Sequence, residues 1–256
     1  MPKDKLLFSG DIMRNIAFKL EYDGTNYHGW QRQDNAVTVQ EVLENTIAKV
    51  TGEHTSVIGC SRTDTGVHAL GYICNFHTNS RIPTDKFPYA LNTQLPSDIR
   101  VLQAFEVAAD FHARYCSKGK KYRYKIINTT FHSVFQRNYA CHWPYPLNVE
   151  LMKKAAQYFI GEHDFRAFMA TGSSVKDTVR NVYALSVEKY AHEIIMEISA
   201  NGFLYNMVRI IAGTLLYVGN HRIDVEDIPY ILNKGDRTQA GITAPAQGLY
   251  LVEVYY

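Results

Sequence analysis

The first half of the chain alternates between strand-like and helix-like hydrophobic patterns. Apolar and polar residues alternate over residues 16–22, which predicts a half-buried strand that ends at an Asp-Gly turn. A Thr-x-x-Glu capping box opens residues 38–52, where apolar residues share one helix face and a glycine closes the helix. Residues 57–60 and 68–77 are two further predicted strands. Asp64 therefore lies on a loop between strands, where a sheet can display a reactive residue.

The second half of the chain loosely repeats this order. The predicted elements are a strand at residues 121–127, a helix at 149–159, strands at 182–190 and 193–200, helices at 203–218 and 225–233, and a strand at 249–255. Two β-α-β-β halves predict an α+β fold, with two ferredoxin-like or RRM-like halves whose antiparallel sheets carry helices on one side. We predict a mobile extension at residues 1–13, an N-terminal half at 14–110 and a C-terminal half at 111–256.

Composition excludes several classes of protein. With 46% apolar and 20% charged residues the chain is not mainly disordered, and a net charge of +2 over 256 residues excludes a uniformly cationic surface. The four cysteines form no C-x-x-C pair, so no metal site is expected. No stretch approaches the roughly 20 apolar residues of a membrane span, and the N-terminus lacks the hydrophobic region of a signal peptide. We therefore expect a cytoplasmic protein without a metal or a membrane partner.

Positive charge is concentrated between residues 111 and 149. These 39 residues contain seven Lys and Arg and no Asp or Glu, which leaves −5 on the rest of the chain. Such a tract favours a polyanionic partner, although on charge alone a solvated strand face explains it equally well. Tyr115, Tyr122 and Tyr124 lie in the same tract, and aromatic rings beside cations suit unpaired RNA bases. The candidate phosphate contacts are Arg114, Lys118, Lys120 and Lys121.

Asp64 is the only acidic residue between His54 and Thr84, and it begins an Asp-Thr-Gly tripeptide. An aspartate in a strand connection is commonly a turn residue. The tripeptide also occurs in aspartic proteases, but these need two carboxylates that share a proton, and this chain has one such tripeptide, with Arg62 beside it. An isolated, ionised aspartate can act as a nucleophile at a sugar or base carbon. The residues alone thus indicate a nucleic-acid enzyme or a non-catalytic RNA-binding module, with an aspartic hydrolase as a remote alternative.

Ordered segments across nearly the whole chain resemble the tRNA pseudouridine synthase A family. They are EYDGTNYHGWQ at residues 21–31, TVQE at 38–41, GCSRTDTGVHA at 59–69, FHAR at 111–114 followed by KYRY at 121–124, GEHDF at 161–165, NGFLYNMVR at 201–209 and APAQGL at 244–249. Three residues depart from the family pattern: Ser61 stands where glycine is usual, Thr65 where alanine is frequent, and Arg166 where serine is common. These departures affect loop details and RNA contacts rather than the chemistry.

The resemblance implies a pseudouridine synthase fold, in which the two halves meet at a central basic active-site cleft. It further implies that Asp64 attacks the target uridine, that Tyr122 stacks on the flipped uracil, and that Arg209 pairs with Asp64 and keeps it ionised. Arg62 would extrude the base or hold its phosphate. The implied substrate is the anticodon stem-loop of tRNA at uridines 38, 39 and 40, and the implied assembly is a homodimer. No cofactor is needed, because a C–N bond is exchanged for a C–C bond without net redox change. Whether Asp64 attacks the base or the sugar stays open.

Overall fold

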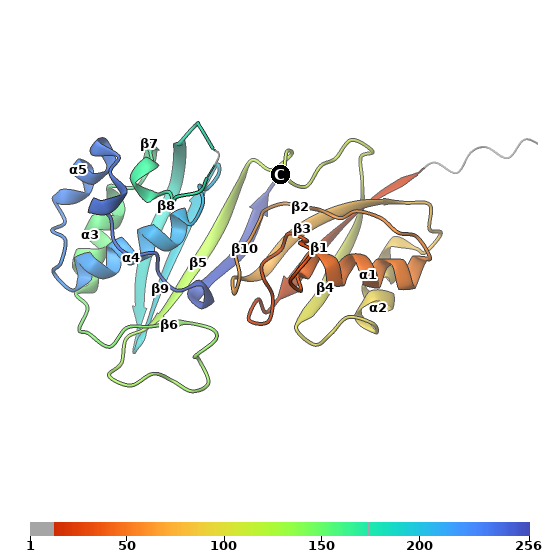
Figure 1. The fold of residues 1–256 in the computed structure, drawn as a ribbon, viewed down its shortest axis with the longest axis horizontal. Coiled ribbons are helices and arrows are strands. Elements are labelled where there is room, and N and C mark those ends of the chain that lie inside the picture. The colour runs from red at the N-terminus through yellow and green to blue at the C-terminus, as the bar shows by residue number, and fades with distance from the viewer. Residues whose placement is uncertain (1–12, 174) are drawn as a thin grey trace, which may run out of the picture.

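The computed structural model describes residues 13–173 and 175–256, so most of the predicted extension at residues 1–13 lies outside the described part. The strands within the described residues are β1 (Arg14–Tyr22), β2 (Ile58–Gly59), β3 (His68–Thr78), β4 (Ile99–Val107), β5 (Gly119–Ile127), β6 (Cys141–His142), β7 (Gly161–Asp164), β8 (Val179–Tyr190), β9 (Glu193–Ala200) and β10 (Leu249–Tyr255). They form one sheet in the order β4-β1-β3-β10-β5-β9-β8-β7, with β2 added to β3 and β6 to β5 (Figure 1).

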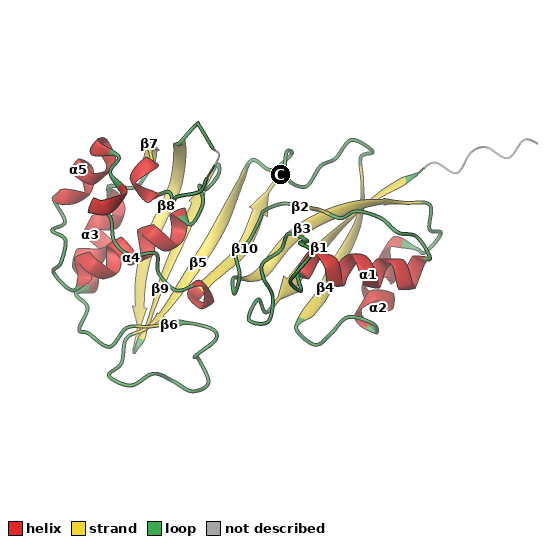
Figure 2. Ribbon diagram, in the orientation of Figure 1, coloured by secondary structure: helices red, strands yellow, loops and turns green. Residues whose placement is uncertain are grey.

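Helices pack on both halves of this sheet. They are α1 (Val39–Thr51), α2 (Phe87–Asn92), α3 (Val149–Gln157), α4 (Met207–Gly219) and α5 (Asp227–Lys234). Figure 2 shows α1 and α2 on the N-terminal half and the other three helices on the C-terminal half. In the N-terminal half, Phe18 and Phe76 of the sheet pack against Phe87 of α2 in a fully buried aromatic cluster. The fold is α+β with a mainly antiparallel sheet, which confirms the predicted fold class.

The last strand joins the two halves. One edge of β10 pairs in parallel with the start of β3, and the other edge pairs antiparallel with β5. Both edges are therefore hydrogen-bonded, and the two half-sheets become one. The sequence pattern predicts β10 with its observed bounds but does not predict its place, because pairing partners far apart in sequence leave no periodic signal. The loop that carries Asp64 ends at β3, so it lies at this junction.

Most predicted elements are confirmed within a few residues. For α1, the Thr38 side chain accepts a hydrogen bond from the backbone N–H of Glu41, and Gly52 ends the helix in the left-handed conformation. The prediction for α4 is wrong at its start, because the helix begins at Met207 rather than at residue 203. The reason is Asn206, whose φ of 59° is left-handed and not helical. The prediction omits the short helix α2, the edge strands β4 and β7, and the two-residue strand β6.

Candidate active site

The segment that follows β1 forms hydrogen bonds with the loop that carries Asp64. Trp30 donates its backbone N–H to the carbonyl of Thr63 at 3.1 Å, and Gly66 donates to the carbonyl of Tyr27 at 3.3 Å. The hydroxyl groups of Tyr22 and Thr63 lie 2.9 Å apart and are buried. Backbone and side-chain hydrogen bonds thus fix the loop on both sides of Asp64, as expected for a site built on a rigid support.

Gly29 allows this supporting segment to approach the backbone of the Asp64 loop closely. Its φ is +81°, and a Cβ at this position would lie 2.4 Å from the carbonyl oxygen of Thr63. Only glycine satisfies both the backbone conformation and the contact. The EYDGTNYHGWQ segment therefore serves the loop that carries Asp64, although 34 residues separate Asp64 from Trp30 in the sequence.

Arg209, on the first turn of α4, contacts Asp64 across the junction. Its Nη1 lies 3.4 Å from Oδ2 of Asp64. The same nitrogen donates to Oδ1 of Asn206 at 2.8 Å, and Nε donates to the carbonyl of Ala244 at 2.7 Å. Three acceptors on different segments therefore orient one guanidinium group. The other carboxylate oxygen of Asp64 accepts no hydrogen bond from any described residue, so it is available to a substrate.

Burial and the ion pair act on the Asp64 carboxyl in opposite directions. Burial raises its pKa, whereas the charge and the hydrogen bond of Arg209 lower it, and burial has the larger effect, so the pKa lies above its ordinary value. The resemblance implies that Arg209 pairs with Asp64 and keeps it ionised. The charge and the hydrogen bond of Arg209 act in that direction, and they offset part of the cost of removing the carboxylate from water.

This raised pKa predicts that Asp64 costs stability at neutral pH. The folded protein disfavours the charged form, so stability falls as pH rises from the ordinary aspartate pKa through the raised value. Asp64→Asn should therefore increase the melting temperature at pH 7, and the difference should vanish below about pH 3, where both side chains are neutral. Thermal unfolding across this pH range measures the effect. An Asp64→Asn variant that is less stable than the parent at pH 7 would contradict the raised pKa of Asp64.

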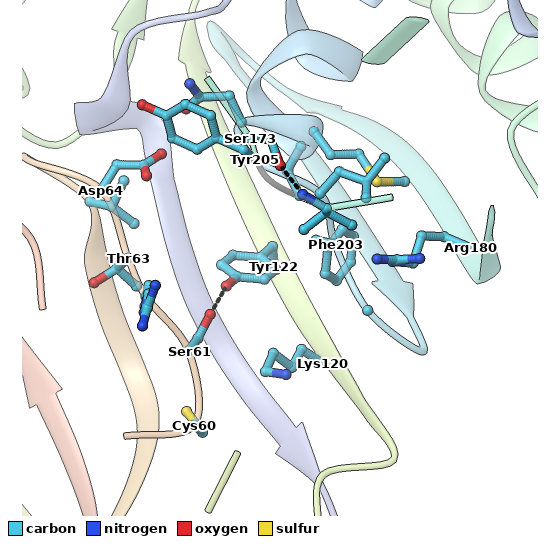
Figure 3. A pocket seen from close by; sticks show the side chains of 18 of the residues that line it. Cys60, Ser61, Thr63, Asp64, Lys120, Tyr122, Ser173, Arg180, Phe203 and Tyr205 are labelled. Atoms are coloured by element: carbon cyan, nitrogen blue, oxygen red, sulfur yellow. Dashed lines mark hydrogen bonds between the residues drawn. The ribbon is translucent and has the colours of Figure 1, made fainter. Parts of the chain in front are cut away.

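Tyr122 of β5 faces the same hollow as Asp64. Its ring is buried and contacts Phe203 edge-to-face, with ring centroids 5.0 Å apart. Its hydroxyl group lies 3.1 Å from Oγ of Ser61, and burial raises the pKa of Tyr122. Figure 3 shows Asp64 and Tyr122 on opposite sides of the hollow, with Tyr205 next to Asp64. Tyr122 and Asp64 are thus separated by 58 residues in the sequence but line one pocket.

This pocket has a volume of about 780 Å³ and lies at the junction of the two halves. Five of the predicted site residues line it: Arg62, Asp64, Arg114, Lys120 and Tyr122. Lys120 extends into it, and burial lowers the pKa of its ammonium group. Lys118 is exposed and does not line the pocket. Lys121 points to the other face of the sheet, where its Nζ lies 2.6 Å from a carboxylate oxygen of Glu197.

Phe203, Arg180 and Tyr205 line the pocket and were not among the predicted site residues. Phe203 falls within the helix predicted at residues 203–218, but it precedes that helix, is half-buried and packs against Tyr122 in the pocket. Arg180 and Tyr205 also line the pocket and lie outside the basic tract that guided the prediction. For Phe203 and Tyr205, the sequence signal is their place in the NGFLYNMVR segment, where two aromatic residues follow a glycine just before the helix.

Asp64 is the only acidic residue that lines this pocket in the described part of the chain. An aspartic hydrolase needs a second carboxylate close by, so the geometry does not support that alternative. Among the described residues, no group of three or more His, Cys, Asp or Glu side chains is placed to hold a metal ion. Within the same residues, none of the helices has the length and apolar character required to cross a membrane.

One hollow thus combines a single carboxylate paired with an arginine, a buried aromatic ring and several cations. This combination suits an enzyme that acts on a nucleic-acid base. The family described as tRNA pseudouridine synthase matches residues 19–116 and 155–256. The tRNA pseudouridine synthase A of Thermoanaerobacter sp. (strain X514) is 60% identical over 244 residues, which cover 95% of this chain and 100% of that protein. The protein of the same name from Ruminiclostridium cellulolyticum is 57% identical with the same coverage.

Among solved structures, the archaeal box H/ACA sRNP Nop10-Cbf5 complex aligns with 93% of this chain and 48% of its own, at 8% identity and a TM-score of 0.39.

The family match and the high identity to full-length relatives show that this chain belongs to the tRNA pseudouridine synthase family. It is an isomerase that converts uridine to pseudouridine in tRNA.

Proposed function

We propose that the enzyme modifies uridines 38, 39 and 40 in the anticodon stem-loop of tRNA, with Asp64 as the nucleophile. The observation that supports this proposal is the convergence of Asp64, Tyr122 and Arg209, which are separated by 58 and 87 residues in the sequence. One carboxylate oxygen is free for the substrate while the other is held by Arg209. The positions within tRNA come from the resemblance to the family.

The proposed reaction begins when the target nucleotide leaves the RNA stack and its uracil enters the pocket against Tyr122. Asp64 attacks the uridine, the glycosidic C–N bond breaks, and the rotated uracil forms a new bond from C5 to the ribose. The bond to Asp64 is cleaved again before the product leaves, which regenerates the free carboxylate. C5 loses a proton and N1 gains one, so the product is an isomer of the substrate. Arg62, Arg114 and Lys120 line the pocket and supply positive charge for the phosphates beside the extruded nucleotide.

Release of tritium from uridine labelled at C5 tests this function directly, because isomerisation at C5 exchanges that hydrogen. We expect release from unmodified tRNA, with one tritium for each uridine at positions 38 to 40. A tRNA in which cytidines replace these uridines should release none. Tight tRNA binding without any release would instead indicate a non-catalytic RNA-binding module. The resemblance also implies a homodimer in the cytoplasm, and light scattering of the purified protein tests the dimer.

Tyr122 should contribute mainly through its ring. Tyr122→Ala removes the stacking surface and should lower kcat/KM by about tenfold to a hundredfold, since stacking on one aromatic ring is worth about 1–3 kcal/mol per base. Tyr122→Phe keeps the ring and loses only the contact with Ser61, so its loss should be clearly smaller. Ser61→Ala is the matched control, because it removes the same contact from the other side. Equal losses for Tyr122→Phe and Tyr122→Ala would assign the main role to the hydroxyl group.

Lys120 and Lys121 are neighbours with different surroundings, and this contrast tests the basic residues. Lys120→Ala should weaken tRNA binding and reduce the slope of log Kd against log salt by about 1. Lys121→Ala should leave that slope unchanged, because Lys121 lies on the far face of the sheet, where it pairs with Glu197, which also binds Arg123. Binding measured by fluorescence anisotropy at several salt concentrations separates the two. Equal slopes for the two variants would remove Lys120 from the phosphate contacts.

A further inference from the structure

A second, smaller hollow of about 170 Å³ adjoins the active-site pocket. The two hollows share Ser61, Arg62, Arg114 and Tyr115, so they are two parts of one groove. The smaller one continues along the groove toward Gln31, which lies just before α1. Its volume suits a single base rather than a whole nucleotide. Of the residues that line this second hollow, the proposed function uses only Arg62 and Arg114.

Tyr115 is the aromatic side chain that the two hollows share. Its side chain is 76% exposed, yet the turn that carries it is firmly held. Nδ1 of His112 accepts the backbone N–H groups of Arg114 and Tyr115, and Ala113 is fully buried, with its backbone N–H donated to Asn75. The Tyr115 ring lies against the His112 imidazole, with ring centroids 4.2 Å apart, and the Arg114 guanidinium lies 5.8 Å from the centroid of the Tyr115 ring. A rigid turn that presents a largely exposed aromatic ring beside a cationic groove is an arrangement on which an unpaired base can stack.

Positive charge lies where the two hollows meet. Arg62 and Arg114 line both, and among the described residues neither has a carboxylate within ion-pair distance. The second hollow has no acidic lining residue in the same part of the chain. Two guanidinium groups without a carboxylate partner, between the active-site pocket and the smaller hollow, match the phosphate that links two consecutive nucleotides.

Gln31 supplies a polar edge at the far end of the second hollow. Its Nε2 donates to Oε1 of Gln40, which also accepts the backbone N–H of Arg32, so the amide of Gln31 is held in place. Oε1 of Gln31 accepts no hydrogen bond from any described residue. The amide therefore offers an acceptor and a second N–H to the edge of a base.

We propose that this second hollow binds the base of a nucleotide next to the target uridine, stacked on Tyr115, with the linking phosphate held by Arg62 and Arg114. This inference rests on the proposed function, because it concerns the same RNA substrate. Stacking tolerates any base, which suits an enzyme that modifies three consecutive positions with different neighbours. Gln31 adds a hydrogen bond at the edge of the stacked base.

Stem-loop RNAs with one target uridine test the proposal. One RNA is intact, one lacks the base on the 5′ side of the target, and one lacks the base on the 3′ side. Tyr115→Ala should lower kcat/KM for the intact RNA by about tenfold and have no further effect on one of the two abasic RNAs, because the stacking partner is already absent. Tyr115→Phe should behave as the parent enzyme. Tyr230→Ala, an exposed tyrosine on α5, is the matched control.

The outcome is independent of whether the proposed positions in tRNA are correct. Absence of tritium release by the parent enzyme would overturn the proposed function, whereas the affinity of the same RNAs, measured by fluorescence anisotropy, still reports on Tyr115. If Tyr115→Ala weakens binding of all three RNAs by the same factor, or of none, the second hollow does not bind a neighbouring base. A loss that disappears with one abasic RNA supports the proposal and identifies the side on which that base lies.

Discussion

Asp64→Asn should reduce tritium release from tRNA by at least about a thousandfold, which is the largest loss we expect from any single substitution. The amide keeps the shape of the carboxyl group but lacks the negative charge that the proposed nucleophile requires. The loop around it is held by Tyr22, Tyr27 and Trp30, none of which contacts the carboxylate, so the pocket should keep its form. The loss should therefore fall on kcat.

Binding of tRNA by the same variant should be unchanged or tighter. Asp64 is the only acidic residue that lines the pocket in the described part of the chain, and RNA brings further negative charge to it. Removing the carboxylate thus removes a repulsion. Single-turnover kinetics and anisotropy on one preparation separate chemistry from affinity. Substantial turnover by Asp64→Asn, after mass spectrometry excludes deamidation to aspartate, would sink the nucleophile assignment.

Local patterns predicted most elements because each depends on neighbouring residues. The alternation along β5 also contained information that the site prediction did not use. Even-numbered and odd-numbered residues of this strand lie on opposite faces of the sheet, so Lys120 and Tyr122, which line the pocket, share a face that Lys121 cannot share. Grouping the lysines by charge, and not by strand face, placed Lys121 among the candidate phosphate contacts.

The rest of the site depends on contacts that a single sequence does not encode locally. Nothing in the spacing of Asp64 and Arg209 shows that they lie 3.4 Å apart, because that contact requires β10 to join the two half-sheets. The family resemblance supplied the pairing instead. The helical pattern of apolar residues extends back to Phe203, but the helix itself begins only after Asn206. A hydrophobic pattern does not show that Asn206 has a left-handed backbone conformation. The same residue aims its side chain at Arg209, so the break in the helix belongs to the site.

Arg209→Ala should lower kcat by about a hundredfold with a much smaller change in KM for tRNA. Arg209 does not line the pocket, so it acts on the substrate only through Asp64. Loss of the guanidinium group frees one carboxylate oxygen from its partner and leaves the carboxyl group without a fixed orientation. Misplacement of a reacting group by about 1 Å can cost about 10²-fold in rate. Circular dichroism should show an intact fold, because Arg209 is a single residue on a helix whose other side is buried.

The pH profile distinguishes this positioning role from a merely structural one. The charge of Arg209 lowers the pKa of Asp64 against the opposing effect of burial, so its removal should raise that pKa further. Because the nucleophile must be ionised, the acid limb of kcat/KM should move to higher pH in Arg209→Ala. Arg209→Lys should restore the acid limb to its original pH, because an ammonium group retains the positive charge. It should restore only part of kcat, because it lacks the planar guanidinium group that reaches Asp64, Asn206 and Ala244 together. An acid limb that stays in place in Arg209→Ala would show that Arg209 supports the fold and not the carboxylate.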